Sequence, residues 1–289
     1  MGRSGSVDAR TPAEIQQQVD ARFDTNTDFW KEVYAGNDVY SVIHQHRQAL
    51  TLALVDQLDL EAGSAALEVG CGAGLMTVAL AQRGFQIDAT DSAPAMVEAT
   101  RESVDAANLS SRVIVTSTDA HSLSFDDEEF ALVVALGVIP WLHSSTKALS
   151  EMARVLERGG YLIVNADNRW RLNYLLDPFF SPVLSPARKA AKWVLRRVGL
   201  WRGTPNASVV NMHTRKEFDR LISSLGLERA SGTMFGFGPF TFAGRKVLPD
   251  RAGVSLHRKL QHMCDRGFPG LRSAGSQYLV LARKPADVG

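Results

Sequence analysis

The sequence Ala-Ala-Leu-Glu-Val-Gly-Cys-Gly-Ala-Gly, at residues 65–74, is the most informative part of this chain for its fold. A mostly apolar run leads into glycines at alternate positions, and an amphipathic run that begins at Leu75 closes with Gly84. Glycine adopts positive φ angles without steric cost and commonly ends helices. The pattern therefore predicts a buried strand, a tight turn and a helix, with the turn at the mouth of a parallel sheet where a ligand can lie against bare backbone.

The spacing of the glycines narrows the kind of ligand. Dinucleotide-binding dehydrogenases use G-x-G-x-x-G or A, whereas here Leu75 stands at the sixth position counted from Gly70. The spacing is G-x-G-x-G, and Glu68 precedes the first glycine by two residues. A second strand-like run, 85–90, leads to Asp91. A carboxylate at the tip of this strand can accept both ribose hydroxyls of a nucleoside.

At these residues the chain resembles the class I S-adenosylmethionine-dependent methyltransferases, whose first motif is an acid followed by x-G-x-G-x-G. Further motifs match in the order that the family has them, with a third strand at 113–115, a fourth at 131–137 and a fifth at 161–164. The resemblance covers roughly residues 60–167. It implies an α/β fold with a doubly wound, Rossmann-like seven-stranded sheet, which closes with an antiparallel strand at 277–282.

The resemblance also implies where the cofactor, S-adenosyl-L-methionine, would bind. Glu68 would lie under its methionine end, and Asp91 would hold the ribose. Asp119 would read the edge of the adenine, and the Leu136 carbonyl would receive the ammonium group. The complete set that the resemblance implies is Glu68, Gly70, Cys71, Gly72, Asp91, Ser92, Met96, Asp119, Ala120 and Leu136. Ala131 stands where the family usually has an acid, which removes a structural contact and leaves the cofactor acids in place.

Segments on both sides extend this core. We expect residues 1–59 to form an N-terminal tail and a helical lid, and residues 60–167 to form the cofactor-binding core. Residues 168–213 would be a cap insertion after strand five. Residues 214–289 would complete the core and carry a second, loop-like cap insertion at about 235–274, after strand six. Both insertions should leave from the carboxyl ends of strands, where open α/β sheets bind ligands.

Aromatic and histidine side chains outside the glycine loop are candidates for the acceptor site. Trp30, Tyr34 and Tyr40 fall in the lid, where they either line the pocket or dock the lid on the core. His143 follows strand four, close to where the family places the methyl group. The sequence identifies no catalytic base, because methyl transfer from a sulfonium depends more on positioning than on proton abstraction.

A basic helix is predicted within the first insertion, at 187–198. Its alanines and valines share one face of a helical wheel, and its lysines and arginines lie largely on the other. No acid occurs between positions 178 and 216. Such a helix can lie on an anionic membrane surface or hold an anionic substrate. The alternative is a cap helix docked by its apolar side, with the cations in water.

Composition and charge limit which partners, metal sites and membrane segments this chain can be expected to have. The chain has 289 residues and a net charge of +1, and it contains no Asn-Pro-Pro-Tyr-type sequence for a flipped base, so nucleic acid is not an expected partner. The two cysteines have no disulfide or zinc-site spacing, which favours a reducing cytoplasm and predicts no metal site. No apolar run approaches 18 residues, so no spanning helix is expected.

The predicted function is that of an S-adenosylmethionine-dependent methyltransferase that acts on a small or amphiphilic metabolite, with oxygen as the acceptor atom by its frequency in the family. Two alternatives remain. An NAD(P)-dependent oxidoreductase is disfavoured by Leu75 and Glu68. A cofactor-binding protein that has lost catalysis would instead work through its cap as an interaction module.

Overall fold

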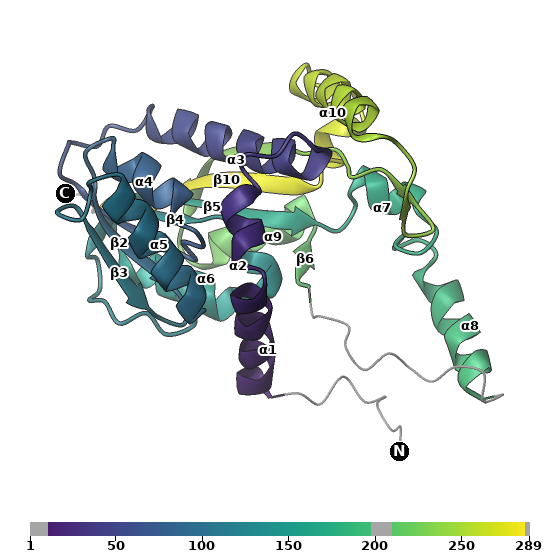
Figure 1. Ribbon diagram of the computed structural model, residues 1–289, viewed down its shortest axis with the longest axis horizontal. Coiled ribbons are helices and arrows are strands. Elements are labelled where there is room, and N and C mark those ends of the chain that lie inside the picture. The colour runs from purple at the N-terminus through teal and green to yellow at the C-terminus, as the bar shows by residue number, and fades with distance from the viewer. Residues whose placement is uncertain (1–10, 198–209, 287–289) are drawn as a thin grey trace.

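Strand β4 (Phe130–Ala135) runs through the centre of the protein, and its side chains explain the layered build. All of them are buried. Leu132 and Val134 belong to one apolar cluster, whereas Val133 and Ala135 belong to a second. A strand that is apolar on both faces needs a helical layer on each side. The computed structural model, which describes residues 11–197 and 210–286, accordingly has a sheet between two layers of helices (Figure 1).

The sheet confirms the predicted doubly wound fold. Its strand order is β3 (Val113–Ser117), β2 (Gln86–Asp91), β1 (Ala65–Val69), β4, β5 (Leu156–Asn168), β10 (Gln277–Arg283) and β7 (Glu228–Phe235). The first five strands are parallel, and β10 is antiparallel to both of its neighbours. A two-residue strand, β6 (Met212–His213), adds an eighth member beside β5. The strand order reverses between β1 and β4, which is where doubly wound sheets bind ligands.

Helices connect the strands and cover both faces of the sheet. The connecting helices are α4 (Leu75–Ala81), α5 (Pro94–Ala106), α6 (Ser145–Val155) and α9 (Arg215–Ser224). Met76 and Leu80 of α4 pack in one apolar cluster, and Met152 of α6 and Phe218 of α9 pack in the other. Thus α4 covers one face of the sheet, and α6 and α9 cover the opposite face.

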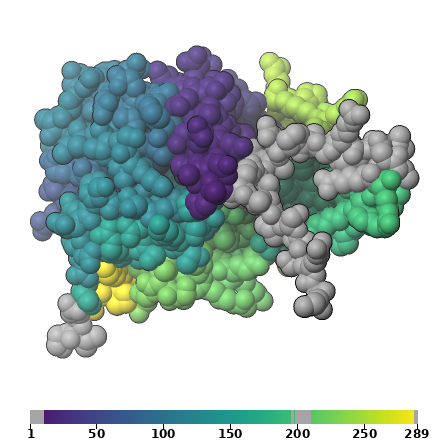
Figure 2. Space-filling model, turned by 90° about the horizontal axis from the view of Figure 1, so that it is seen from below, coloured from purple at the N-terminus to yellow at the C-terminus, as the bar shows by residue number. Residues whose placement is uncertain are grey.

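The segment before the sheet is helical, and we call it the lid. It contains α1 (Pro12–Thr25), α2 (Thr27–Glu32) and α3 (Val39–Val55). Thr11 and Glu14 form a capping box that starts α1. The lid lies against the core (Figure 2). Lys31 of α2 pairs with Glu102 of α5 at 2.6 Å. The predicted tail, residues 1–10, lies outside the described residues.

The first insertion contains α7 (Leu172–Leu176) and α8 (Ser185–Arg197), and α8 projects away from the sheet (Figure 1). The short helix η1 (Ile139–Trp141) lies outside the insertion, after β4. The last residue of the predicted basic helix, at 198, lies outside the described residues. The described alanines and the valine on the apolar face of α8 are exposed; they are Ala187, Ala190, Ala191 and Val194. The interpretation of α8 as a helix docked by its apolar side is therefore wrong.

The second insertion differs from the expected loop. It begins with a small hairpin, β8 (Thr241–Phe242) and β9 (Arg245–Lys246), and continues as α10 (Asp250–Asp265) and η2 (Leu271–Ser273). Helix α10 has 16 residues, and it packs beside α3 and β7 through His257, Gln261 and Cys264, which are buried. Basic residues interrupt its apolar pattern, which is why sequence periodicity did not identify it. Within the described residues, no helix is both long enough and apolar enough to span a membrane.

Candidate active site

A cavity of about 420 Å³ lies at the carboxyl ends of the parallel strands, beside the point where the strand order reverses. All the predicted cofactor-binding residues line it; they are Glu68, Gly70, Cys71, Gly72, Asp91, Ser92, Met96, Asp119, Ala120 and Leu136. Trp30, Tyr34 and Tyr40 of the lid line it as well. His143 is not among the described residues that line this cavity. The cavity therefore brings together the predicted residues of the core and the lid, but not His143.

The glycines after β1 serve two different purposes. Gly70, Gly72 and Gly74 have φ angles of +73°, +56° and +80°, a region that other residues rarely adopt. A Cβ atom at Gly70 would collide with the Val138 side chain, so this glycine is required by close packing. A Cβ atom at Gly72 would meet nothing within 4 Å, and Gly72 lines the cavity. A larger residue at Gly72 would therefore take up space that a ligand can fill.

Asp91 fixes the turn at the end of β2. Its two carboxylate oxygens accept hydrogen bonds from the backbone N–H groups of Gly72 and Ala93, each at 3.0 Å. Burial raises the pKa of Asp91, whereas these two N–H donors oppose the rise. A carboxylate oxygen can accept more than one hydrogen bond, so Asp91 can hold the glycine turn and still accept hydroxyl groups of a ligand.

The lid is bonded to this same turn. Ser92 donates a hydrogen bond to Asp20 of α1 at 2.7 Å, and Gln16 of α1 donates to Ser92 at 3.0 Å. Gln16 also lines the cavity. Helix α1 therefore closes over the cavity next to Ser92, and its contact is polar and within reach of solvent.

Glu68 lies at the end of β1 with an exposed fraction of only 3%. Burial raises its pKa to about 8, although the Thr77 hydroxyl, which donates to Glu68 Oε2 at 2.5 Å, acts in the opposite direction. The nearby Asp91 raises the pKa further. Burial therefore favours the protonated form of Glu68, although the charge of Arg47 opposes it, and Glu68 lines the cavity.

Arg47 of α3 is a site residue that the sequence interpretation missed. Its side chain is buried and lines the cavity, with one guanidinium nitrogen donating to the Tyr34 hydroxyl at 3.0 Å. Its Nε has no hydrogen-bond partner, and no described carboxylate forms an ion pair with it. The guanidinium packs against Gly137, whose N–H donates to the buried Asn165 at 2.7 Å. A buried cation with an unused donor in a cavity is suited to an anionic ligand.

Aromatic rings of the lid surround a neutral histidine. Ring centroids of Trp30, Tyr34 and Tyr40 lie 6.1, 6.0 and 4.2 Å from that of His44. His44 Nδ1 lies 2.9 Å from the Tyr40 carbonyl, so Nδ1 carries the proton and Nε2 keeps its lone pair. Burial and the charge of Arg47 lower the pKa of His44 to about 3. His44 is therefore a hydrogen-bond acceptor at neutral pH, and it is too weakly basic to act as an effective proton acceptor.

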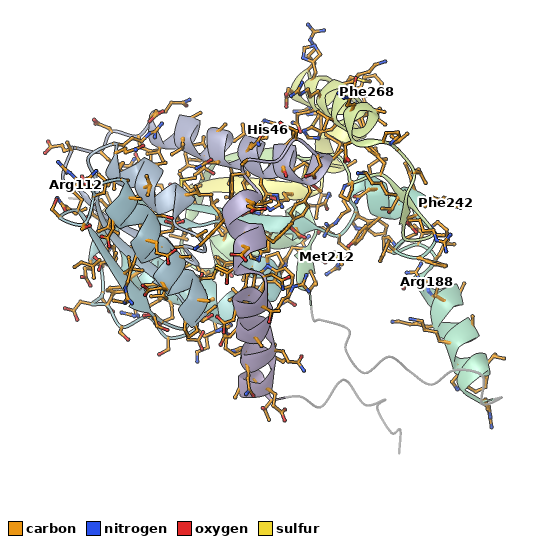
Figure 3. The ribbon with its side chains drawn as sticks, in the orientation of Figure 1. His46, Arg112, Arg188, Met212, Phe242 and Phe268 are labelled. Atoms are coloured by element: carbon orange, nitrogen blue, oxygen red, sulfur yellow. The ribbon has the colours of Figure 1, made fainter. Side chains whose placement is uncertain are left out.

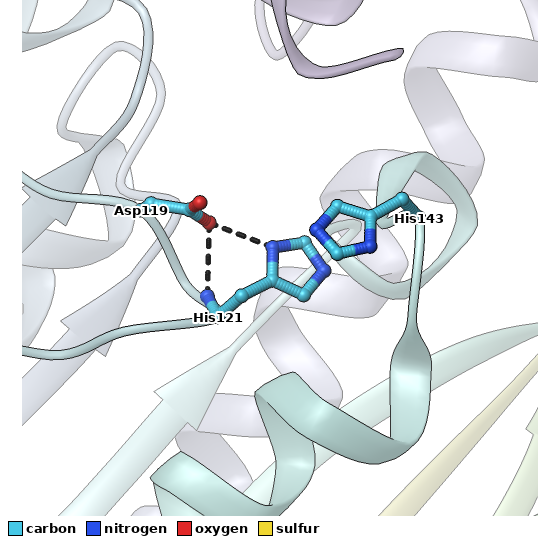
Figure 4. A group of neighbouring side chains, drawn as sticks. All are labelled: Asp119, His121 and His143. Carbon is cyan, nitrogen blue, oxygen red and sulfur yellow. Dashed lines mark hydrogen bonds and ion pairs between the residues drawn. The ribbon is translucent and has the colours of Figure 1, made fainter. Parts of the chain in front are cut away.

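Asp119 is held by a second histidine, His121, which the sequence interpretation also missed (Figure 4). Asp119 Oδ1 accepts hydrogen bonds from the His121 backbone N–H at 2.9 Å and from its ring Nδ1 at 2.7 Å. The Ser144 N–H donates to His121 Nε2, which assigns the proton to Nδ1. His143 stacks on this ring with centroids 3.6 Å apart.

These three side chains also have ligand atoms within 4.8 Å of one another, as a metal site would. Both nitrogens of His121 are already engaged, and the two rings are nearly parallel, so their in-plane lone pairs do not converge on one point. His121 instead binds one carboxylate oxygen of Asp119, Oδ1. The other oxygen is available to a ligand, since Asp119 lines the cavity.

Polar groups also lie where the cavity approaches the first insertion. Asp167 at the end of β5 pairs with Arg171 at 2.8 Å, and both line the cavity. The Arg171 guanidinium lies 4.3 Å from the ring centroid of Tyr174 of α7, which also lines the cavity. The cavity therefore extends from the glycine turn to the base of the cap.

Comparisons with known proteins agree with this geometry. A family described as "Methyltransferase domain" matches residues 67–164. Methyltransferase GfsG of Streptomyces halstedii is 30% identical over 118 residues, which are 40% of this chain and 42% of the relative. The 27-O-demethylrifamycin SV methyltransferase of Amycolatopsis mediterranei (strain S699) is 28% identical over 156 residues, or 53% and 57% of the two chains. The matched part thus spans about half the length of these curated relatives.

Solved structures share the fold over almost the whole chain. Magnesium protoporphyrin IX methyltransferase from Synechocystis PCC 6803, with bound SAH, has a TM-score of 0.61 and 17% identity, and the match covers 93% of this chain and 98% of that one. The [4+2]-cyclase SpnF has a TM-score of 0.62 and 18% identity, with 94% and 97% covered. At this identity, the likeness establishes the fold alone.

Proposed function

The chain carries a class I S-adenosylmethionine-dependent methyltransferase domain, and from this premise we propose that it transfers a methyl group from S-adenosylmethionine to an oxygen atom of a small or amphiphilic metabolite. The family's cofactor supplies an electrophilic methyl group on a sulfonium. The protein's part is to bind both partners, align them and exclude water.

One observation carries the cofactor assignment. The cavity has an anion, Asp91, beside the glycine turn and a buried, incompletely bonded cation, Arg47, beside Gly137. S-adenosylmethionine joins a ribose to an amino acid, so it offers hydroxyls to the first group and a carboxylate to the second. The Leu136 carbonyl would accept from the ammonium group, and Asp119 would accept from the adenine amino group. Open space at Gly72 fits the close approach of such a ligand.

A neutral hydrogen-bond acceptor in the lid, His44, supports the proposal that the methyl group is transferred to oxygen. His44 Nε2 keeps a lone pair and lies among the rings of Tyr34 and Tyr40. We infer that His44 Nε2 accepts a hydrogen bond from the hydroxyl group of the metabolite that is to be methylated. This bond would direct a lone pair of that hydroxyl oxygen toward the methyl group. The name of the rifamycin relative describes a 27-O-methylation, which agrees with this chemistry. The surrounding aromatic rings favour an acceptor with an apolar body.

The test has two parts. Calorimetry should detect binding of S-adenosylhomocysteine to the full chain and no binding of NAD. Radiolabel from S-adenosyl-[methyl-3H]methionine should then move to a member of a panel of hydroxylated amphiphiles. Because SpnF is a cyclase with the same fold, a second candidate function is cofactor binding without methyl transfer. That outcome would show S-adenosylhomocysteine binding, with no label transferred to any acceptor.

A further inference from the structure

Large apolar side chains on the outside of the two insertions are exposed, and we call this set of residues the cap surface. Their exposed fractions lie between 43% and 63%. The cap surface consists of Leu176, Phe179, Phe180, Val183, Leu184, Trp193, Val194, Phe242 and Val247. These residues come from α7, α8, the segment between them, the β8–β9 hairpin and the residue that follows it. A monomeric protein rarely leaves so many large apolar side chains together in water without a use for them.

The cap surface is held in shape by a buried acid. Asp177 Oδ2 accepts hydrogen bonds from the Thr241 hydroxyl at 2.8 Å and from the Gly244 N–H at 3.0 Å. Its other oxygen accepts from the Phe179 N–H at 2.8 Å. One carboxylate therefore joins the end of α7 to the β8–β9 hairpin, and it presents Phe179 and Phe242 from one connected unit. Figure 3 shows Phe242 and Arg188 at this end of the molecule.

The cap surface is bordered by cations. On α8, Lys189 lies one turn before Trp193 on the same side of the helix, and both side chains are exposed. Arg197 stacks over Trp193 at 5.0 Å, and Arg245 lies in the hairpin. No acid occurs between positions 178 and 216. Exposed aromatic and aliphatic side chains beside lysines and arginines are typical of helices that lie in a membrane interface, whereas lysine is depleted in protein–protein interfaces.

We propose that the cap surface docks on an anionic lipid bilayer. Apolar side chains of α8 and the hairpin enter the interface, and the lysines and arginines contact lipid phosphates. The cap surface is connected to the cavity, which supports a lipid bilayer as its binding partner. The ring of Phe180 stacks on that of Tyr174 at 5.1 Å, and Tyr174 lines the cavity. Docking there brings the end of the cavity that Tyr174 lines toward the bilayer, which can supply an amphiphilic molecule. The docking itself does not depend on methyl transfer.

The test is sedimentation of the full chain with phosphatidylcholine vesicles that do or do not contain 30 mol% phosphatidylglycerol. We expect binding to the anionic vesicles only, weakened by added salt. K189Q/K192Q should weaken binding about tenfold or more, since each charge near the surface contributes to attraction. F179S/F242S should weaken it to a similar extent through loss of apolar insertion. Both pairs are exposed, so thermal unfolding should stay close to wild type.

Matched controls change the same residue types elsewhere. K216Q/R220Q removes two exposed charges from α9, and F268S removes an exposed phenylalanine after α10. Both should sediment as the wild type does. Three results would overturn the proposal: a wild type that stays in the supernatant, cap variants that bind like the wild type, or light scattering in which F179S/F242S abolishes self-association. Calorimetry with S-adenosylhomocysteine tests the proposed function separately from membrane docking, because the cap variants should bind S-adenosylhomocysteine as the wild type does.

Discussion

Replacing Arg47 by Met is the sharpest perturbation of the cavity. Met keeps an apolar stem of similar length and removes the guanidinium. If the guanidinium holds the cofactor's carboxylate, the variant loses charge-assisted hydrogen bonds, which contribute about 1.5–3 kcal/mol. Each 1.4 kcal/mol is tenfold in affinity, so the dissociation constant for S-adenosylhomocysteine should rise about 10- to 150-fold.

Isothermal titration calorimetry with two ligands makes the expectation specific. S-adenosylhomocysteine contains the amino acid, whereas 5′-methylthioadenosine has the same nucleoside and lacks it. Arg47→Met should weaken the binding of S-adenosylhomocysteine and leave the binding of 5′-methylthioadenosine unchanged. Asp91→Ala is the contrasting variant, because it removes the proposed ribose acceptor and should weaken both ligands.

The free protein supplies an independent readout. Because Arg47 Nε has no partner, its removal relieves the cost of an unsatisfied buried donor and loses one bond to Tyr34. We expect the melting temperature without ligand to stay level or rise. Three results would contradict a role of Arg47 in binding the cofactor's carboxylate: Arg47→Met weakens the binding of both ligands equally, leaves S-adenosylhomocysteine binding unchanged, or lowers the melting temperature by several degrees.

Three further predictions concern the floor of the cavity. Burial raises the folded-state pKa of Glu68 to about 8, so its contribution to stability is complete below its ordinary value near 4.5 and is lost as pH rises through 8. Glu68→Gln should flatten the fall in melting temperature between pH 6 and 8.5, and an unchanged slope would contradict the assignment. Gly72→Val should reduce the affinity for S-adenosylhomocysteine by at least about tenfold, because it places a side chain in open cavity space at a residue with positive φ. Cys71→Ser should change this affinity little. If calorimetry shows the larger loss for Cys71→Ser, a role for thiol chemistry would be indicated. His121→Phe should weaken S-adenosylhomocysteine binding a fewfold by freeing Asp119, with His143→Phe as the control that keeps binding near wild type.

The sequence was most informative where backbone geometry leaves little choice. The glycine turn predicted a strand, a helix and a cavity, because positive φ angles at Gly70 and Gly72 admit few other residues. Asp91 followed from its position at the end of an apolar run. The parallel, doubly wound sheet followed from apolar runs that alternate with helical patterns along the chain.

Features that depend on tertiary contacts were not predicted. Arg47 belongs to the buried stripe of α3, which places every fourth residue inward; the stripe is Val39, Ile43, Arg47, Thr51 and Val55. A charged residue in the middle of such a stripe was the signal that could have identified it. His121 gave no such signal, because its role comes from contacts with Asp119 and Ser144 across two loops. The apolar face of α8 was recognised, but pattern alone could not establish that the face stays uncovered.

A crystal structure of the full chain in complex with S-adenosylhomocysteine would show the cofactor-binding mode directly. We predict one bound molecule in the cavity, with its ribose hydroxyls on Asp91, its adenine amino group near Asp119 and its carboxylate on the Arg47 guanidinium. A ligand whose carboxylate points away from Arg47, or one that binds outside the cavity, would contradict it.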